Sequence, residues 1–241
     1  MILVESKNLN AAYHFAVEEL FTRYLRLKEP VLMLWQTKKT VMLGSNQVVE
    51  AEIDTEFALG SAINIVRRSS GGGAIYTDTG TILYTVIRQL KGDAGQMREK
   101  TAAAIVSALQ KLGVPAVREG RNDILAEGKK ISGFAQYTSG DHVCTHGSLL
   151  YDTDLETLTD VLIANEKKLR PKGIASIRSR VTNIKPYIKE KYSVEEFKLI
   201  MRNMLISETN HTLYEFTSDD KKKIDRIYNK KYANPEWNLR M

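Results

Sequence analysis

The fold is decided by the stretch RRSSGGGAIYTDTGT, residues 67–81. The residues before the glycines, INIVRR (63–68), are typical of a strand. The β-branched and aromatic run TILYTVI (81–87) predicts a buried strand. A Walker loop requires a lysine after its glycines and a helix directly behind them, and a dinucleotide loop requires G-x-G-x-x-G opening a helix. Neither pattern is present, so the glycines are predicted to connect strand to strand.

The other elements mix strands with helices. The runs VLMLW (31–35) and TVMLG (40–44) predict strands joined by a short polar turn, and residues 123–137 predict a hairpin turning at Glu127-Gly128. Apolar spacing and capping signals predict helices at about 11–27, 97–112, 154–163, 193–207 and 218–231. Strict βαβ alternation is absent, and turn signals between neighbouring strands favour hairpins. We therefore expect an α+β fold with a mixed or antiparallel sheet and flanking helices.

Composition limits the classes of function. The chain has 241 residues and a formal net charge of +6, which favours acidic or phosphorylated partners. Its one cysteine, Cys144, excludes a disulfide within the chain and fits a reducing compartment. There is no apolar run long enough for a membrane span and no signal-peptide pattern, so we expect a cytoplasmic protein without a membrane partner.

A basic run, KKKIDRIYNKK (221–231), raises the question of nucleic-acid binding. Ile224, Ile227 and Tyr228 recur in it at helical spacing. The lysines are then the exposed face of an amphipathic helix, and no nucleic-acid partner is predicted.

The glycine run itself has two interpretations. Without Cβ atoms the backbone can approach a ligand closely, its N–H groups can hold an anion, and Arg68 can add a forked donor for phosphate or carboxylate. Alternatively, it is a tight turn beside two surface arginines. The combination RRSSGGG entering a strand favours a binding loop.

A second stretch, RNDILAEGKKISG (121–133), contains candidate charged ligands. Asp123 can hold Mg²⁺ beside phosphates, because hard oxygen ligands suit that ion. If Ile131 packs in the core, Lys130 and Ser132 share the opposite face of the strand. Lys130 there would meet an acyl-phosphate, or it would be a solvated hairpin lysine. Position alone leaves both open.

The third stretch, THGSLL (145–150), follows Cys144. His146 is either an acid–base group, a contact for an apolar ligand, or a hydrogen-bonded strand histidine. In a strand Cys144 and His146 lie on one face, so His146 could activate Cys144 as a nucleophile. The alternative is that Cys144 is a buried structural thiol. We find no metal-ligand spacing between Cys144 and the histidines, and predict no zinc site.

The chain closely resembles the lipoate–protein ligase family over nearly its whole length, from NLNAAYHFAVEE onward. The resemblance lies in the order and spacing of four motifs: RRSSGGGAIYTDTG, NDILAEGKKISGFA, THGSLLYDTDL and KGIASIRSRVTNI. The resemblance implies an α+β sheet shared with biotin ligases and related to class II synthetase cores. It also implies one catalytic domain, 1–241, ending where longer members enter an accessory domain. The implied reaction joins lipoate to ATP as lipoyl-AMP and transfers the lipoyl group to a carrier lysine.

The same resemblance assigns the site. Lys130 matches the family lysine that contacts both lipoate and nucleotide and is the implied catalytic residue. The implied ATP contacts are Lys130 with Arg68, Gly73, Ala74, Ile75, Tyr76, Asn122 and Asp123. The implied lipoate contacts are Lys130 with Ser70, Gly71, Gly72 and His146. Asp123 is the implied ligand for Mg²⁺.

The partners and the alternatives follow from the same family. The implied carrier is a lipoyl domain or a glycine-cleavage H-type protein, and family carriers are commonly acidic. A separate accessory protein for activation is a further expectation. The main alternative is an ATP-independent lipoyl or octanoyl transferase of the same fold, which has a cysteine near the position of Asn122-Asp123. A biotin ligase would carry an Arg- and Gly-alternating loop, which RRSSGGG does not match.

Overall fold

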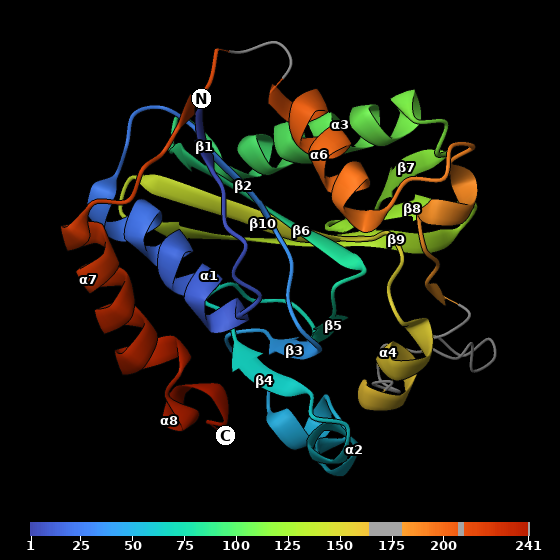
Figure 1. Cartoon of the computed structure of the whole chain (residues 1–241), viewed down its shortest axis with the longest axis horizontal. Coiled ribbons are helices and arrows are strands. Elements are labelled where there is room, and N and C mark those ends of the chain that lie inside the picture. The colour runs from blue at the N-terminus through green and yellow to red at the C-terminus, as the bar shows by residue number, and fades with distance from the viewer. Residues whose placement is uncertain (164–179, 207–209, 241) are drawn as a thin grey trace.

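A computed structural model describes residues 1–163, 180–206 and 210–240 of the protein. Its main sheet has eight strands in the order β11-β1-β2-β6-β10-β9-β8-β7 (Figure 1). The pairs β11–β1 and β1–β2 are parallel and the others are antiparallel. The strands are β1 (Ile2–Val4), β2 (Val31–Trp35), β6 (Thr81–Gln89), β7 (Ala116–Glu119), β8 (Asp123–Ala126), β9 (Lys129–Ser139), β10 (His142–Leu150) and β11 (Thr212–Leu213). The predicted mixed sheet is confirmed.

A second, three-stranded sheet holds β3 (Thr40–Leu43) between β4 (Asn64–Arg67), which is parallel to it, and β5 (Ile75–Thr77), which is antiparallel. The glycine run connects β4 to β5, so the expectation of a strand-to-strand loop is confirmed. The strands expected at 31–35 and 40–44 are confirmed as β2 and β3, joined by a short turn, but they do not pair with each other. The short turn after Trp35 carries the chain into the second sheet instead, because β2 already has β1 and β6 as neighbours.

Helices cover both faces of the main sheet (Figure 1). One face packs on α3 (Ala94–Lys111) and α6 (Val194–Ile206). The other packs on α1 (Ala11–Glu19) and α7 (Ser218–Ile227). The second sheet packs on α2 (Thr55–Gly60) and α4 (Leu155–Val161). In the described residues, no helix has both the length and the apolar character that crossing a membrane requires.

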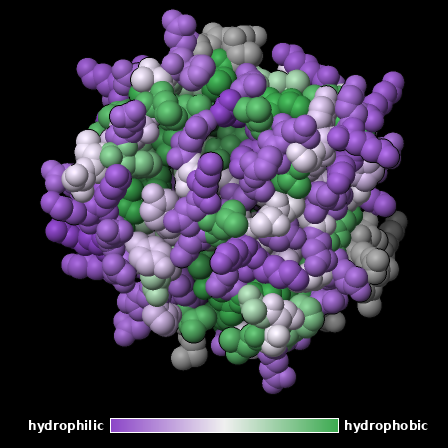
Figure 2. Space-filling model, viewed as in Figure 1, coloured by the Kyte–Doolittle hydropathy of each residue, from purple (hydrophilic) through white to green (hydrophobic). Residues whose placement is uncertain are grey.

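The predicted helices are present, with differences at their ends. The helix expected at 11–27 is α-helical to Glu19 and continues as a π-helix over Leu20–Leu25. The helix expected at 218–231 likewise becomes π-helical over Tyr228–Tyr232, before the short α8 (Pro235–Asn238). The lysines of 221–223 are exposed, and Figure 2 shows strongly hydrophilic residues gathered over this helix. The amphipathic interpretation of the basic run is therefore confirmed.

Capping signals fix where the helices begin. The Asn10 side chain accepts from the backbone N–H of Ala12, as expected of an N-cap. The Thr217 and Asp220 side chains form a reciprocal capping box at the start of α7. Before α6, the Glu196 carboxylate accepts from the Ser193 N–H, and the Ser193 hydroxyl accepts from the Glu196 N–H.

The β8–β9 hairpin turns at Glu127-Gly128, as predicted. Both residues have positive φ, 49° and 77°, which is the two-residue turn that suits a twisted hairpin. A register shift between Ile124 and Leu125 places Lys130 opposite Leu125. Irregular pairing changes which face a side chain uses. Ser132 is accordingly buried among core residues, whereas one third of the Lys130 side chain is exposed, so the expectation that these two share a face is wrong.

Candidate active site

The candidate site is a cavity between the glycine loop and strands β9 and β10. It contains about 580 Å³ of empty space, including its open mouth. Its inner wall is apolar and is made by side chains of α1, β2, β3 and β6: Phe15, Trp35, Met42 and Leu83. Lys130 lies on its wall together with Gly133 and Gly147. A cavity that is mostly apolar with a few polar groups is the usual form of a small-molecule site.

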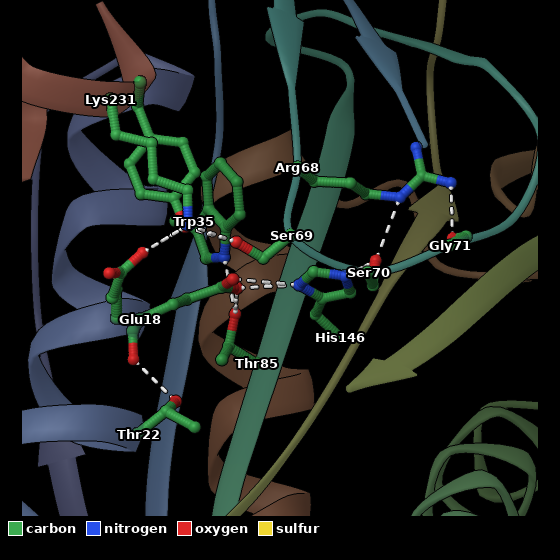
Figure 3. Close-up of polar contacts among 12 residues, drawn as sticks. Glu18, Thr22, Trp35, Arg68, Ser69, Ser70, Gly71, Thr85, His146 and Lys231 are labelled. Atoms are coloured by element: carbon green, nitrogen blue, oxygen red, sulfur yellow. Dashed lines mark hydrogen bonds and ion pairs between the residues drawn. The ribbon is translucent and has the colours of Figure 1, made fainter. Parts of the chain in front are cut away.

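A buried polar network supports one side of this cavity (Figure 3). The His146 Nδ1–H donates to both carboxylate oxygens of Glu18, at 3.0 and 2.9 Å. The Ser70 hydroxyl lies 2.6 Å from His146 Nε2 and accepts from Arg68 Nε at 3.1 Å. Ser70 can then donate to Nε2, which fixes the His146 tautomer. His146 is thus a hydrogen-bonded strand histidine that also lines the cavity.

Arg68 stabilises the glycine loop from inside. Its guanidinium donates to the carbonyl oxygens of Met42, Gly71 and Gly73, at 2.8, 3.0 and 2.7 Å. Burial lowers the pKa of Arg68 to about 10, and the nearby Glu18 carboxylate opposes that shift. Arg68 therefore stays charged at neutral pH. It is only 5 % exposed, so the surface-arginine interpretation is wrong for this residue.

Two glycines, one in the loop and one in the turn beneath it, are required by the local geometry. Gly72 has φ 102°, a conformation that favours glycine. A Cβ on Gly44 would stand 2.1 Å from the Gly72 carbonyl oxygen, so the turn after β3 supports the loop directly. Gly71, by contrast, is exposed and has open space around its Cα.

Lys130 lies between the apolar cavity and a second, larger hollow. That hollow contains about 1450 Å³ of open space and includes Tyr76, Asp123 and Lys130 on its wall. The residues shared by both walls are Gly73, Ala74, Ile75, Lys130 and Gly133. The Lys130 ammonium is 2.8 Å from Asp123 Oδ1. It lies over Gly133, where a Cβ would stand 2.8 Å from Lys130 Nζ.

Oxygen ligands for a cation are present beside Lys130. Glu119 of β7 pairs with Asp123 of β8 across the antiparallel ladder, and both carboxylates border the second hollow. Magnesium usually takes one or two protein carboxylates and completes its shell with phosphate oxygens and water. Asp123 and Glu119 fit that requirement.

Cys144 lies in the core beside this network. Its sulfur is one of three potential ligand atoms, with Glu18 and His146, that lie within 4.8 Å of one another. Sequence spacing gave no indication of this cluster, because Glu18 comes from a distant helix. Burial, with a further contribution from Glu18, raises the pKa of Cys144 well above its ordinary value. The thiol is therefore protonated, and both nitrogens of His146 are already hydrogen-bonded.

The structure brings the predicted site residues together. Lys130, Arg68, Gly72, Gly73, Ala74, Ile75, Asn122 and His146 line the apolar cavity, and Tyr76 and Asp123 line the adjoining hollow. Ser70 is hydrogen-bonded to His146, and Gly71 borders a separate hollow together with Gly72. The motif KGIASIR (172–178) lies outside the described residues. Sequence reasoning missed Phe15 and Trp35, whose positions resemble ordinary core positions. It also missed Glu18, whose helical position resembles that of a solvated carboxylate.

Comparison with known proteins gives consistent matches. The model of the lipoyl protein ligase A/B catalytic domain matches residues 10–205. The lipoate-protein ligase LplJ of Bacillus subtilis is 33% identical over 242 residues, covering 99% of this chain and 73% of the relative.

Two solved structures are similar over almost their whole length. A bi-partite lipoate protein ligase of Thermoplasma acidophilum, described with its E2 lipoyl domain, has a TM-score of 0.85 at 27% identity; the match covers 99% of this chain and 95% of that one. A lipoate-protein ligase A bound with ATP has a TM-score of 0.82 at 26% identity, with coverage of 99% and 97%.

Proposed function

The chain belongs to the lipoyl protein ligase A/B catalytic-domain family and is a lipoate–protein ligase, and from that premise we propose how its residues perform the reaction. Lys130 is the catalytic residue of this proposal. The observation that carries it is the position of its ammonium, on the wall shared by the apolar cavity and the second hollow.

The apolar cavity is the proposed lipoate site. The carboxylate end of the acid lies at Lys130 and the tail runs toward Trp35 and Phe15, because the inner wall is made of apolar side chains and Lys130 supplies the cation. His146 borders the tail, while Ser70, Gly71 and Gly72 form the loop that covers it. The Glu18–His146–Ser70 bonds keep that loop against β10.

The second hollow is the proposed ATP site. Gly73, Ala74, Ile75 and Tyr76 form its wall near the shared boundary, and Asp123 of β8 lies on that wall as well. Asn122, in the turn just before β8, borders the adjoining apolar cavity and is proposed to contact the nucleotide where the two spaces meet. Arg68 acts on the nucleotide through the loop, since four of its N–H···O contacts go to that loop and to β3. This assignment makes Arg68 a positioning residue rather than a direct phosphate ligand.

In the first step a lipoate carboxylate oxygen attacks the α-phosphorus of ATP. The bond from that phosphorus to the bridging oxygen breaks, and pyrophosphate leaves with the electron pair. Negative charge accumulates on the oxygens around the phosphorus. A fixed ammonium beside both reactants stabilises that charge more in the transition state than in the ground state. Lys130 is placed for this because it borders both sites.

In the second step the neutral amine of a carrier lysine attacks the acyl carbon of lipoyl-AMP. The acyl C–O bond to the phosphate breaks, AMP leaves with the electron pair, and the amine loses a proton to form the amide. Lys130 again faces the developing negative charge, first on the acyl oxygen and then on the departing phosphate.

A divalent cation fits beside this lysine. Asp123, with Glu119 as a second carboxylate, would hold Mg²⁺ against the phosphate oxygens. The ion would neutralise phosphate charge during activation. The Lys130–Asp123 contact of 2.8 Å keeps the ammonium oriented when no nucleotide is bound.

Four further expectations belong to the proposal. Residues 1–241 form the catalytic unit, and a separate accessory protein assists activation. The carrier is a lipoyl domain or an H-type protein, drawn by the net charge of +6. The site of action is the cytoplasm. The ATP-independent transferase alternative is not favoured, since Cys144 is fully buried and its raised pKa makes it a poor nucleophile.

Mass spectrometry of candidate carriers tests the function. Lipoyl domains and H-type proteins are incubated with lipoate, ATP and Mg²⁺, using wild type beside Lys130→Ala. The expected product is one added lipoyl group per carrier with wild type, at a rate at least a hundredfold above that of the variant, roughly the effect of losing one transition-state donor. No added mass on any carrier, supplied with either ATP and lipoate or synthetic lipoyl-AMP, would refute the function.

A further inference from the structure

The end of β4 enters the glycine loop with side chains pointing alternately to two different parts of the molecule. Arg68 and Ser70 face the substrate cavity and its Glu18–His146 network. Arg67 and Ser69 face the other way, toward the C-terminal segment 228–240. Such alternation is the normal geometry of extended backbone. The loop is therefore bonded on one side to the site and on the other to a segment outside the matched catalytic-domain region.

Of the two residues, Arg67 makes more hydrogen bonds to the C-terminal segment. It is fully buried, and its guanidinium donates to the carbonyl oxygens of Trp237 and Arg240, both at 3.0 Å. Its backbone N–H donates to Asn238 Oδ1 at 2.9 Å, and its carbonyl accepts from the Trp237 indole at 2.8 Å. Both the side chain and the backbone of Arg67 are thus bonded to α8 and its flanks.

The same guanidinium also reaches the turn beneath the loop. It donates to the carbonyl oxygens of Gly44 and Gln47, at 2.9 and 2.6 Å. Gly44 packs directly under Gly72, and the Ser45 N–H donates to the Ser70 carbonyl at 2.9 Å. Arg67 therefore connects segment 228–240 to the surface on which the glycines lie.

Ser69 provides the second contact. Its hydroxyl is 2.7 Å from the Tyr232 hydroxyl and accepts from Lys231 Nζ at 2.9 Å. Lys231 and Tyr232 both donate to Glu19 Oε2, at 2.7 and 2.9 Å. Glu19 follows Glu18 on α1, so neighbouring carboxylates stabilise the two sides of the loop entrance. Figure 3 shows Lys231 and Ser69 on the side of the network away from Gly71.

We propose that segment 228–240 is a clamp that holds the glycine loop in its substrate-binding conformation, with Arg67 and Ser69 as the positioning residues between them. The inference rests on the proposed function, because it takes the loop as part of the lipoate and ATP sites. None of the clamp residues lines the apolar cavity or the second hollow. The Tyr232 ring also packs on Phe15 of the cavity wall, with ring centroids 5.6 Å apart, and Tyr232→Phe keeps that ring. The polar contacts of the clamp act on the reaction through the loop.

This arrangement predicts a particular kinetic signature. If loosening the clamp leaves only a fraction of molecules with the loop in place, the apparent dissociation constant rises by the inverse of that fraction. Saturating substrate selects the competent molecules again. KM should therefore rise while kcat is retained, whereas a variant that merely unfolds more easily lowers the active concentration and leaves KM unchanged.

The test uses Tyr232→Phe and Asn238→Ala, singly and together. The first removes the hydroxyl that contacts Ser69 and Glu19, and the second removes the acceptor for the Arg67 N–H. Asp93→Ala is the matched control, because it removes the N-cap of α3 without touching the loop or the segment. Thermal unfolding of all variants allows comparison at equal stability.

We expect the double variant to raise KM for lipoate about tenfold, with kcat within about twofold of wild type. Amide hydrogen exchange of residues 69–74 should be faster in the free variant and return to the wild-type rate with lipoate and ATP bound. Asp93→Ala should change neither quantity. If the double variant does not fold, Tyr232→Phe alone gives the same two readouts.

Two results would overturn the clamp. One is a KM and an exchange rate equal to those of Asp93→Ala. The other is a loss of kcat with KM unchanged. If wild type itself fails to ligate lipoate, the proposed function is refuted, and hydrogen exchange of residues 69–74 in the free protein still decides whether the segment holds the loop.

Discussion

Gly133→Ala should move the Lys130 ammonium without removing it. The added Cβ would stand 2.8 Å from both Cε and Nζ of Lys130. Non-bonded carbon atoms prefer roughly 3.5–4.0 Å, so the end of the lysine must shift by roughly 1 Å. The atom in the way is the end of a flexible side chain, and the backbone can therefore stay in place.

Stability and activity should respond differently to this change. Alanine in a strand gains about 0.5–1 kcal/mol over glycine. Weakening the Lys130–Asp123 pair, whose side chains are each more than a third exposed or close to it, loses at most about 1 kcal/mol. The free energy of unfolding should then change by less than about 1 kcal/mol. A misplacement of about 1 Å at a reacting centre can cost roughly a hundredfold in rate, and that is the expected loss in kcat/KM.

The assay is steady-state formation of lipoylated carrier, measured beside urea unfolding of the same preparations. Gly60→Ala is the control, because a Cβ there meets no atom within 4 Å, and α2 lies away from the cavity. It should retain wild-type activity. An activity of Gly133→Ala within threefold of wild type, with Lys130 still present, would show that the position of this ammonium does not limit the reaction.

The remaining predictions concern pH, the thiol and strand packing. Burial lowers the pKa of His14 to about 4. In the acidic range the unfolded state therefore binds more protons than the folded state. The stabilisation from neutral His14 is complete above about pH 6.5 and is lost as the pH falls toward 4. Between pH 7 and pH 5 the free energy of unfolding should drop by about 2 kcal/mol, and His14→Gln should abolish that part of the slope in urea titrations. Cys144→Ala should keep the rate of lipoylation within about threefold of wild type, because a thiol whose pKa is raised well above its ordinary value is not the nucleophile. Loss of activity at unchanged stability would restore the transferase alternative. Gly147→Ala should lower the free energy of unfolding by about 1–3 kcal/mol in thermal unfolding. Its Cβ would collide with the Tyr84 hydroxyl and would stand 2.8 Å from the Gly133 carbonyl oxygen of the adjacent strand. An unchanged Tm would contradict this packing.

Local signals in the sequence predicted much of the fold. Turn chemistry at Glu127-Gly128 predicted the β8–β9 hairpin, and capping residues such as Asn10 and Thr217 predicted helix starts. Which strands pair with one another could not be predicted from local sequence. The strand at 40–43 pairs with 64–67 and 75–77, because the edges of β2 are already occupied. The π-helices after Glu19 and Ile227 also have no sequence signature that we can identify.

The site shows the same division. Lys130, Asn122 and the glycines were identified from motif order, and the structure gathers them around one cavity. Glu18 was missed because a glutamate at a helical position looks solvated, whereas here it accepts from His146 and from the Thr85 hydroxyl in the core. Arg67 was missed for a related reason, since a pair of arginines before a loop suggests a surface. Only the tertiary structure brings the carbonyl oxygens of Gly44 and Trp237 to that guanidinium.

The measurement closest to the central claim is a crystal structure of the protein with a non-hydrolysable lipoyl-adenylate. The tail should occupy the cavity beside Trp35, and Lys130 Nζ should lie within about 3 Å of both the acyl oxygen and an α-phosphate oxygen. A bound adenylate with the Lys130 amine directed into solvent, more than about 6 Å from either group, would contradict the account.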